Sequence, residues 1–157
     1  MQYNPPNPII AIIAEWNPFH LGHQAMIGNI RNQYPDATFI AAMSGSFVQR
    51  GEPALFDKWT RARWALESGI HIVFELPTLY ALQSADLFAS YGVMMVSHTG
   101  ATHLAFSTES LSKEELLDAA AWATSETYLA IFHQALQKGI SYGQAAYEAM
   151  SYHSSFL

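Results

Sequence analysis

The sequence PIIAIIAEWNPFHLGH, from Pro8 to His23, decides the fold. Its apolar run Ile9–Ala14 is typical of a strand that is buried on both faces of a parallel sheet. Asn17-Pro18 should end this strand, because proline has no N–H and keeps the preceding residue out of the helical conformation. Helical spacing resumes from residue 22 to residue 33. The two histidines therefore fall in or just before the first turn of a helix.

This position suits a phosphate group, because a helix begins with unpaired N–H groups and the positive end of its dipole. His20 and His23 are three residues apart and share one face, and Gly22 has no Cβ to keep a nucleotide away from the backbone. Two alternatives stay open. Such a pair is often an ordinary surface feature, and a metal site usually adds a third ligand. We predict phosphate binding and assign no metal ligand.

The composition predicts one globular domain. The chain has 157 residues, of which 50% are hydrophobic and 13% charged, so it can bury a core and is unlike a disordered chain. It contains no apolar run of about 18 residues and no basic signal segment, and we expect a cytoplasmic protein without membrane contact. The absence of cysteine excludes disulfides and thiolate chemistry.

The formal net charge of −6 argues against a broad nucleic-acid-binding surface, because neutralisation of phosphates supplies much of such binding. Only seven lysines and arginines are present. Lys58, Arg61 and Arg63 are close in sequence, with Arg50 just upstream. We expect a local positive patch there, too small to hold a large RNA.

Strand and helix patterns alternate along most of the chain. They predict a Rossmann-like three-layer α/β sandwich with a parallel sheet and a helical C-terminal tail. Further strands are expected over 38–43, 70–76 and 101–106, and further helices over 57–68 and from Ser84 or Asp86 to 96. The ligand site should lie where the first, second and fourth strands end.

The domain layout follows from these elements. We expect an extended arm over 1–8, an α/β core with the phosphate site over 9–110, and a helical tail of the same domain over 111–157. The tail should hold three helical segments, which begin at a capping box at Ser112, at Glu126 and at Ser141.

The loop SGSFVQRGEP, from Ser44 to Pro53, follows the second predicted strand. Small residues at the carboxyl end of a strand are expected where a ligand approaches, although a plain connecting loop fits equally well. In the next helix, Lys58 and Arg61 share a face. They suit either a solvated basic surface or a contact with a phosphate or carboxylate.

Four blocks of sequence carry a family resemblance: AEWNPFHLGH, MSGSFVQRGEPALFDKWTRARWAL, FELPTLYALQSADLFA and LAFSTE. In order and spacing they closely resemble the N-terminal part of the tRNA(Met) cytidine acetate ligases, which belong to the H-x-G-H nucleotidyltransferase superfamily. The resemblance extends over residues 9 to 150. It implies that ATP and acetate form acetyl-adenylate, and that the acetyl group passes to N4 of the wobble cytidine of elongator tRNA(Met).

The resemblance also implies roles for individual residues. His20 and His23 would be catalytic and would stabilise the α-phosphate, with Mg²⁺ shared by the phosphates. The residues expected at the nucleotide are Ile13, Ala14, Glu15, Asn17, Pro18, Phe19, Gly22 and Ser107. The residues expected at the substrate are Ser44, Gly45, Gln49, Arg50, Lys58 and Arg61. Where Ser107 stands, the family pattern F-G-S-E has glycine, and serine fits there if its backbone dihedrals are ordinary.

The resembled ligases are much longer than this chain. We expect that their C-terminal half, with further ATP contacts and the tRNA contacts, has no counterpart after Tyr152, so that tRNA(Met) is a partner only of a completed protein. The oligomeric state is left unassigned. Two other functions stay open: an adenylyltransferase for a phosphorylated small molecule, as in coenzyme biosynthesis, and a noncatalytic nucleotide-binding module.

Overall fold

The computed structural model describes residues 7–108 and 111–153. Contacts divide the chain into two compact units, Met1–Ser107 and Thr108–Leu157. Most of the expected extended arm, residues 1–6, lies outside the described residues, and the two residues that follow it have no regular structure. The first unit holds the sheet and the second holds the helical tail.

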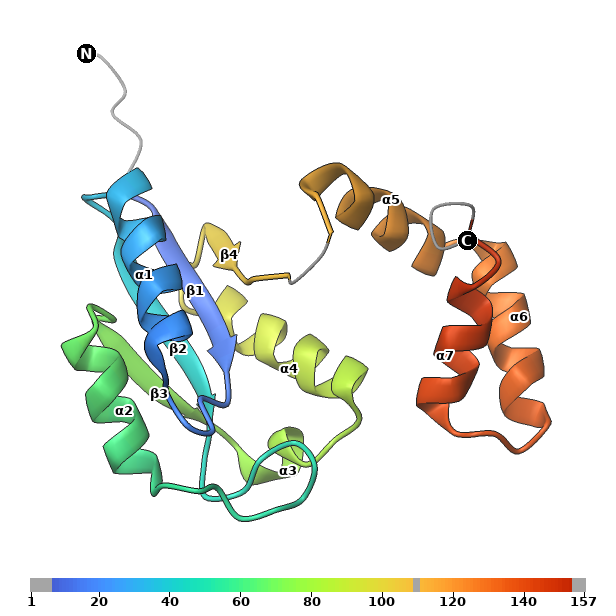
Figure 1. The fold of residues 1–157 in the computed structure, drawn as a ribbon, viewed down its shortest axis with the longest axis horizontal. Coiled ribbons are helices and arrows are strands. Elements are labelled where there is room, and N and C mark those ends of the chain that lie inside the picture. The colour runs from blue at the N-terminus through green and yellow to red at the C-terminus, as the bar shows by residue number, and fades with distance from the viewer. Residues whose placement is uncertain (1–6, 109–110, 154–157) are drawn as a thin grey trace. The chain divides into compact units, whose positions relative to one another are not determined.

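A parallel sheet of order β3-β2-β1-β4 forms the centre of the first unit (Figure 1). Its strands are β1 (Ile9–Ala14), β2 (Thr38–Ser44), β3 (Ile72–Leu76) and β4 (His103–Ala105). β1 pairs with β2 on one side and β4 on the other. Ile10, Ala11 and Ile12 are 2% exposed or less, which confirms the prediction of a strand buried on both faces.

β3 and β4 begin later than the sequence predicts, because side chains replace main-chain partners at their starts. Nδ1 of His71 accepts a hydrogen bond from the Phe39 N–H at 2.8 Å. Oγ1 of Thr102 accepts one from the Ile9 N–H at 3.0 Å. The regular ladder therefore starts only after each of these residues.

Helices cover both faces of the sheet, as predicted for a three-layer α/β sandwich. They are α1 (Leu21–Gln33), α2 (Lys58–Glu67), α3 (Thr78–Ala81) and α4 (Ala85–Ser97). Ile27 of α1 and Ala65 of α2 belong to the larger core cluster, whereas Val96 of α4 packs against the opposite face. The single turn α3, which follows Pro77, was not predicted.

The second unit consists of α5 (Lys113–Ala123), α6 (Glu126–Gln137) and α7 (Tyr142–Met150). Ser112 and Glu115 form the predicted capping box of α5. The indole N–H of Trp122 donates to the Ala149 carbonyl at 3.0 Å, which links α5 to α7. Among the described residues, no helix is long and apolar enough to cross a bilayer.

A glycine fixes how closely α4 approaches the sheet. A Cβ on Gly92 would lie 2.7 Å from the side chain of Ile13 in β1. A Cβ on Gly28, inside α1, would have no neighbour within 4 Å.

Substitutions at these two glycines should change the free energy of unfolding in opposite directions. Gly92→Val should lower the free energy of unfolding by about 1–3 kcal/mol, because it overpacks the interface between α4 and β1. Gly28→Ala should raise it by about 0.5–1 kcal/mol through better helix propensity. Urea unfolding followed by circular dichroism measures both changes. Equal effects of the two substitutions would contradict the close approach at Gly92.

Candidate functional site

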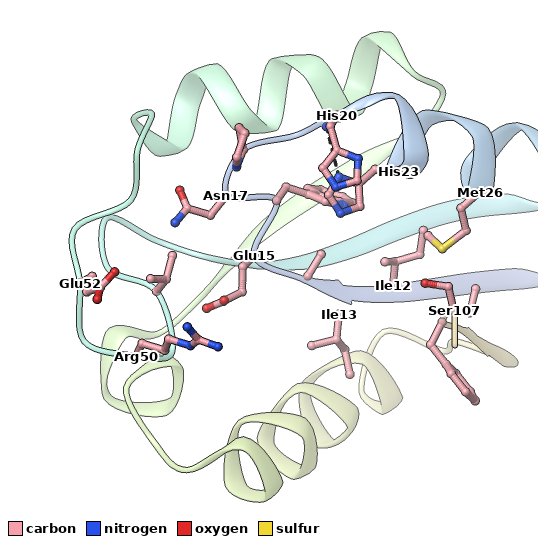
Figure 2. A pocket seen from close by; sticks show the side chains of 16 residues that line it. Ile12, Ile13, Glu15, Asn17, His20, His23, Met26, Arg50, Glu52 and Ser107 are labelled. Carbon is pink, nitrogen blue, oxygen red and sulfur yellow. Dashed lines mark hydrogen bonds between the residues drawn. The ribbon is translucent and has the colours of Figure 1, made fainter. Parts of the chain in front are cut away.

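A cavity of about 610 Å³ lies at the carboxyl edge of the sheet (Figure 2). This is the edge at which the sequence predicts the ligand site, because β1, the loop after β2, and β4 all contribute to its wall. The residues that line it are Ile12, Ile13, Ala14, Glu15, Trp16, Asn17, Pro18, His20, His23, Met26, Val48, Arg50, Glu52, Ala105, Phe106 and Ser107.

His20 and His23 cap the helix that carries them. His20 is the N-cap of α1, and its Nδ1 accepts from the Gly22 N–H at 3.1 Å. Nδ1 of His23 accepts from the His20 N–H at 3.2 Å, which completes a reciprocal capping box made of two imidazoles. The rings stack with their centroids 3.7 Å apart. The helix end and the histidine pair therefore form one structural unit.

These hydrogen bonds fix the tautomer of both rings. Because each Nδ1 accepts a main-chain N–H, each neutral imidazole carries its proton on Nε2. Burial lowers the pKa of His23, and the neighbouring His20 lowers it further. With each Nδ1 engaged by a main-chain N–H, each ring can offer its Nε2–H as a donor to an anion, which is a way to bind a phosphate without transferring a proton.

The absence of a side chain at Gly22 leaves space for the imidazole of His20. A Cβ at Gly22 would lie 3.0 Å from Cε1 of His20, so the glycine makes room for the imidazole. Gly22 does not line the cavity itself. The close approach of a nucleotide to this glycine stays a prediction.

The turn between β1 and α1 depends on Trp16, which the sequence interpretation missed. Trp16 is buried with a φ of 47°, a left-handed conformation that is unusual for a bulky residue. Its ring meets Phe19 edge-to-face at 5.5 Å, and Phe19 meets His23 at 5.5 Å. This aromatic series supports the imidazole from the core. A cis peptide joins Asn17 to Pro18 in the same turn.

Glu15 and Asn17 hold the loop that follows β2. A carboxylate oxygen of Glu15 accepts from the Gln49 N–H at 2.5 Å, and the Asn17 side-chain oxygen accepts from the Leu55 N–H at 2.7 Å. Both residues were expected at the nucleotide, and both do line the cavity. Their main-chain partners show that they also position the loop that brings Arg50 to the site (Figure 2).

Arg61 was expected at the substrate, but the structure places it in the interior of the first unit. It is fully buried, and its guanidinium donates to the carbonyls of Phe56, Glu15 and Gly45. Burial lowers the pKa of Arg61, and the nearby carboxylates of Glu15, Asp57 and Glu75 oppose that shift. Because its donors are directed at main-chain carbonyls and it does not line the cavity, Arg61 ties the ends of β1 and β2 to the start of α2.

Lys58 is also directed away from the cavity. Its ammonium group forms an ion pair with Glu75 of β3 at 2.5 Å. Because Lys58 is paired with Glu75 and Arg61 is buried, these two side chains do not contribute to the exposed positive patch expected from the sequence. Arg50 alone among its members lines the cavity.

Only some of the site residues predicted from the sequence line the cavity. The predicted residues that line it are Ile13, Ala14, Glu15, Asn17, Pro18, His20, His23, Arg50 and Ser107. Those that do not are Phe19, Gly22, Ser44, Gly45, Gln49, Lys58 and Arg61. Ser107 has no positive φ, so serine is accommodated in place of the family's glycine with an ordinary backbone.

Metal binding has little support from side chains alone. Within residues 7–108 and 111–153, no group of three histidine or acidic side chains could hold a metal ion. The carboxylates of Glu15 and Glu52 do line the cavity. One or two carboxylates are sufficient for Mg²⁺ that arrives with a nucleotide, since the phosphates and water supply its other ligands.

The fold and the cavity together define a class of protein. A doubly covered parallel sheet with two imidazole donors at the first strand–helix turn is the arrangement of a nucleotidyltransferase. The family model described as HIGH Nucleotidyl Transferase matches residues 7–156. The chain belongs to this family.

Within the family, the chain is similar to tRNA(Met) cytidine acetate ligases. It is 46% identical over 135 residues to the Lactococcus lactis subsp. cremoris protein of that name, a match that covers 85% of this chain and 34% of the relative. The Exiguobacterium relative is 46% identical over 142 residues, which is 88% of this chain and 38% of the relative. These matches confirm the resemblance found in the sequence.

A solved structure agrees with these relatives. Thermotoga maritima TmcAL bound with alpha-thio ATP matches with a TM-score of 0.79 and 37% sequence identity. The match covers 91% of this chain and 35% of the TmcAL chain. The chain thus spans about a third of the length of the relatives that it matches.

The environment of His23 predicts its titration. The pKa of His23 should lie below 6.5, because burial and the stacked His20 both disfavour its charged form. Titration of the imidazole Cε1–H resonances by NMR measures this directly. His20→Asn, which keeps a good N-cap residue, should move the midpoint of His23 upward. A midpoint at or above 6.5 in the unsubstituted chain would show that the ring is solvated and unstacked.

Proposed function

We propose that this chain binds ATP and activates acetate as acetyl-adenylate, the first step of cytidine acetylation in tRNA(Met). The pair of neutral imidazoles, presented at the N-terminus of α1, is the observation that carries the proposal. The similarity to cytidine acetate ligases supports acetate as the acceptor, and the ATP analogue bound to the Thermotoga protein supports ATP as the donor.

The proposed reaction is an in-line displacement at the α-phosphorus. An acetate oxygen forms a bond to phosphorus while the bond to the pyrophosphate oxygen breaks, so acetyl-adenylate and pyrophosphate are the products. Negative charge then gathers on the nonbridging α-phosphate oxygens. The Nε2–H groups of His20 and His23 would stabilise it, with both rings neutral throughout.

Arg50 is the cation placed to help this displacement. It comes from the loop that Glu15 and Asn17 hold, and its side chain lines the same cavity as the histidines. We propose that its guanidinium binds the departing pyrophosphate or the acetate carboxylate, both of which match its planar donors. Ile13, Ala14, Pro18 and Ser107 would border the nucleotide.

Mg²⁺ would neutralise charge on the phosphates of ATP. Glu15 and Glu52 are the cavity carboxylates that would hold it, together with phosphate oxygens and water. The acetyl group would pass to tRNA in a second step. There N4 of the cytidine attacks the acetyl carbon, AMP leaves, and N4 loses a proton.

A double substitution separates catalysis from helix capping. His20→Asn combined with His23→Gln removes both imidazoles but keeps residue types that form an N-cap and a capping box. Acetate-dependent pyrophosphate release from ATP should fall by about 10²–10⁴-fold, in line with the loss of oriented donors. The thermal unfolding midpoint should change little.

Two controls test whether the loss of activity is specific to the imidazoles and to acetate. Gln33→Leu, at the far end of α1, should leave pyrophosphate release unchanged. Replacing acetate by phosphorylated acceptors tests the alternative adenylyltransferase function. Faster release with such an acceptor would contradict acetate activation, and tight ATP binding without any release would indicate a noncatalytic module.

A further inference from the structure

A second cavity, of about 450 Å³, adjoins the histidine pair between the start of α1 and the end of α2. His20 lines both cavities. A ligand in the second cavity would therefore lie next to the group that is proposed to hold the α-phosphate. No step in the proposed formation of acetyl-adenylate uses this second cavity.

The walls of the second cavity combine aromatic rings with hydrogen-bonding groups. Phe19 and Trp64 contribute rings, and Trp64 is braced edge-to-face by Phe56 at 4.9 Å. Gln24 and Glu67 contribute an exposed amide and an exposed carboxylate. In the part of the chain that the structure describes, neither of these two side chains has a hydrogen bond or an ion pair with another residue.

This set of groups fits a cytosine base. A flipped-out base of single-stranded RNA is typically stacked on an aromatic ring and hydrogen-bonded along its Watson–Crick edge. The amide of Gln24 can accept from N4–H and donate to N3 of cytosine. The carboxylate of Glu67 can accept from N4–H, a pairing that is common for acidic side chains with cytosine. Uracil presents the acceptor O4 in place of N4–H, so the contact with the Glu67 carboxylate would be lost, whereas the Gln24 amide can rotate to fit either base.

An exposed arginine lies beside the same groove. Arg31 is in the last turn of α1, and its guanidinium packs against Gly69, which directly follows Ser68 of the cavity wall. The structure shows no ion pair for Arg31 within the described residues. A guanidinium at this place can bind a phosphodiester of the RNA strand that carries the base.

We propose that the second cavity, lined by Phe19, Trp64, Gln24 and Glu67, receives the cytosine that accepts the acetyl group. The proposal rests on the proposed function, because it requires acetyl-adenylate in the first cavity. His20, which lines both cavities, would then border donor and acceptor alike, and N4 of cytosine would reach the acetyl carbon past the edge of the imidazole. Base binding would thus belong to α1 and α2.

The test is an NMR titration of the full chain with CMP and with UMP. Saturating ATP is present, so that the nucleotide cavity is filled and pyrimidine nucleotides report on other sites. CMP should shift the indole N–H resonance of Trp64 and the side-chain amide of Gln24, and it should bind about tenfold more tightly than UMP. Trp59, an exposed residue outside the cavity, is the internal reference.

Matched variants establish which contacts select the base. Glu67→Gln should reduce the preference for CMP over UMP, Gln24→Leu should weaken the binding of both nucleotides, and Gln33→Leu, in the same helix as Gln24, should change neither. Equal binding of the two nucleotides, or shifts that spare Trp64, would overturn the proposal. Pyrophosphate release with acetate is measured separately on the unsubstituted chain. Failure of that release would contradict the proposed function, while lost base selectivity contradicts only the assignment of this cavity.

Discussion

The reciprocal hydrogen bonds between His20 and His23 are the interaction on which the site depends. Each imidazole satisfies one main-chain N–H at the start of α1 through Nδ1, and this leaves Nε2–H as its free donor. Helix capping therefore uses Nδ1 of each ring and leaves the opposite side of the ring available to a ligand. Because Nδ1 accepts a main-chain N–H in both rings, and burial lowers the pKa of His23, the pair suits oriented donation better than proton transfer.

The strand ends and the loop beside the histidine pair are held together by contacts between residues that are far apart in sequence. Arg61, buried beneath the site, joins the carbonyl of Glu15 at the end of β1 to that of Gly45 after β2. The side chain of Glu15 in turn holds the loop that carries Arg50. A charged residue that does not line the cavity thus organises the site. The guanidinium of Arg61 also donates to the hydroxyl of Ser44, a second buried polar group at the carboxyl edge of the sheet.

Local sequence signals predicted the parts of the fold that depend on neighbouring residues. The apolar run of β1, the Asp57 cap of α2 and the capping box at Ser112 all form as expected. Arg61 was misjudged, because its partners lie far away in sequence and a charged residue on a helix suggests solvent or ligand. Trp16 was missed for a related reason: its conformation is set by packing, and only its position two residues after the end of β1 hinted at it.

The proposed role of the histidine pair requires that both imidazoles are protonated on Nε2 and directed at a phosphate. Long-range ¹H–¹⁵N correlation spectra of the histidine rings, recorded near neutral pH with and without ATP and Mg²⁺, test this arrangement. We expect the Nε2–H tautomer for His20 and His23 in the free chain, and a change at Nε2 with little change at Nδ1 once ATP binds. An Nδ1–H tautomer, or Nε2 resonances that ignore ATP, would contradict it.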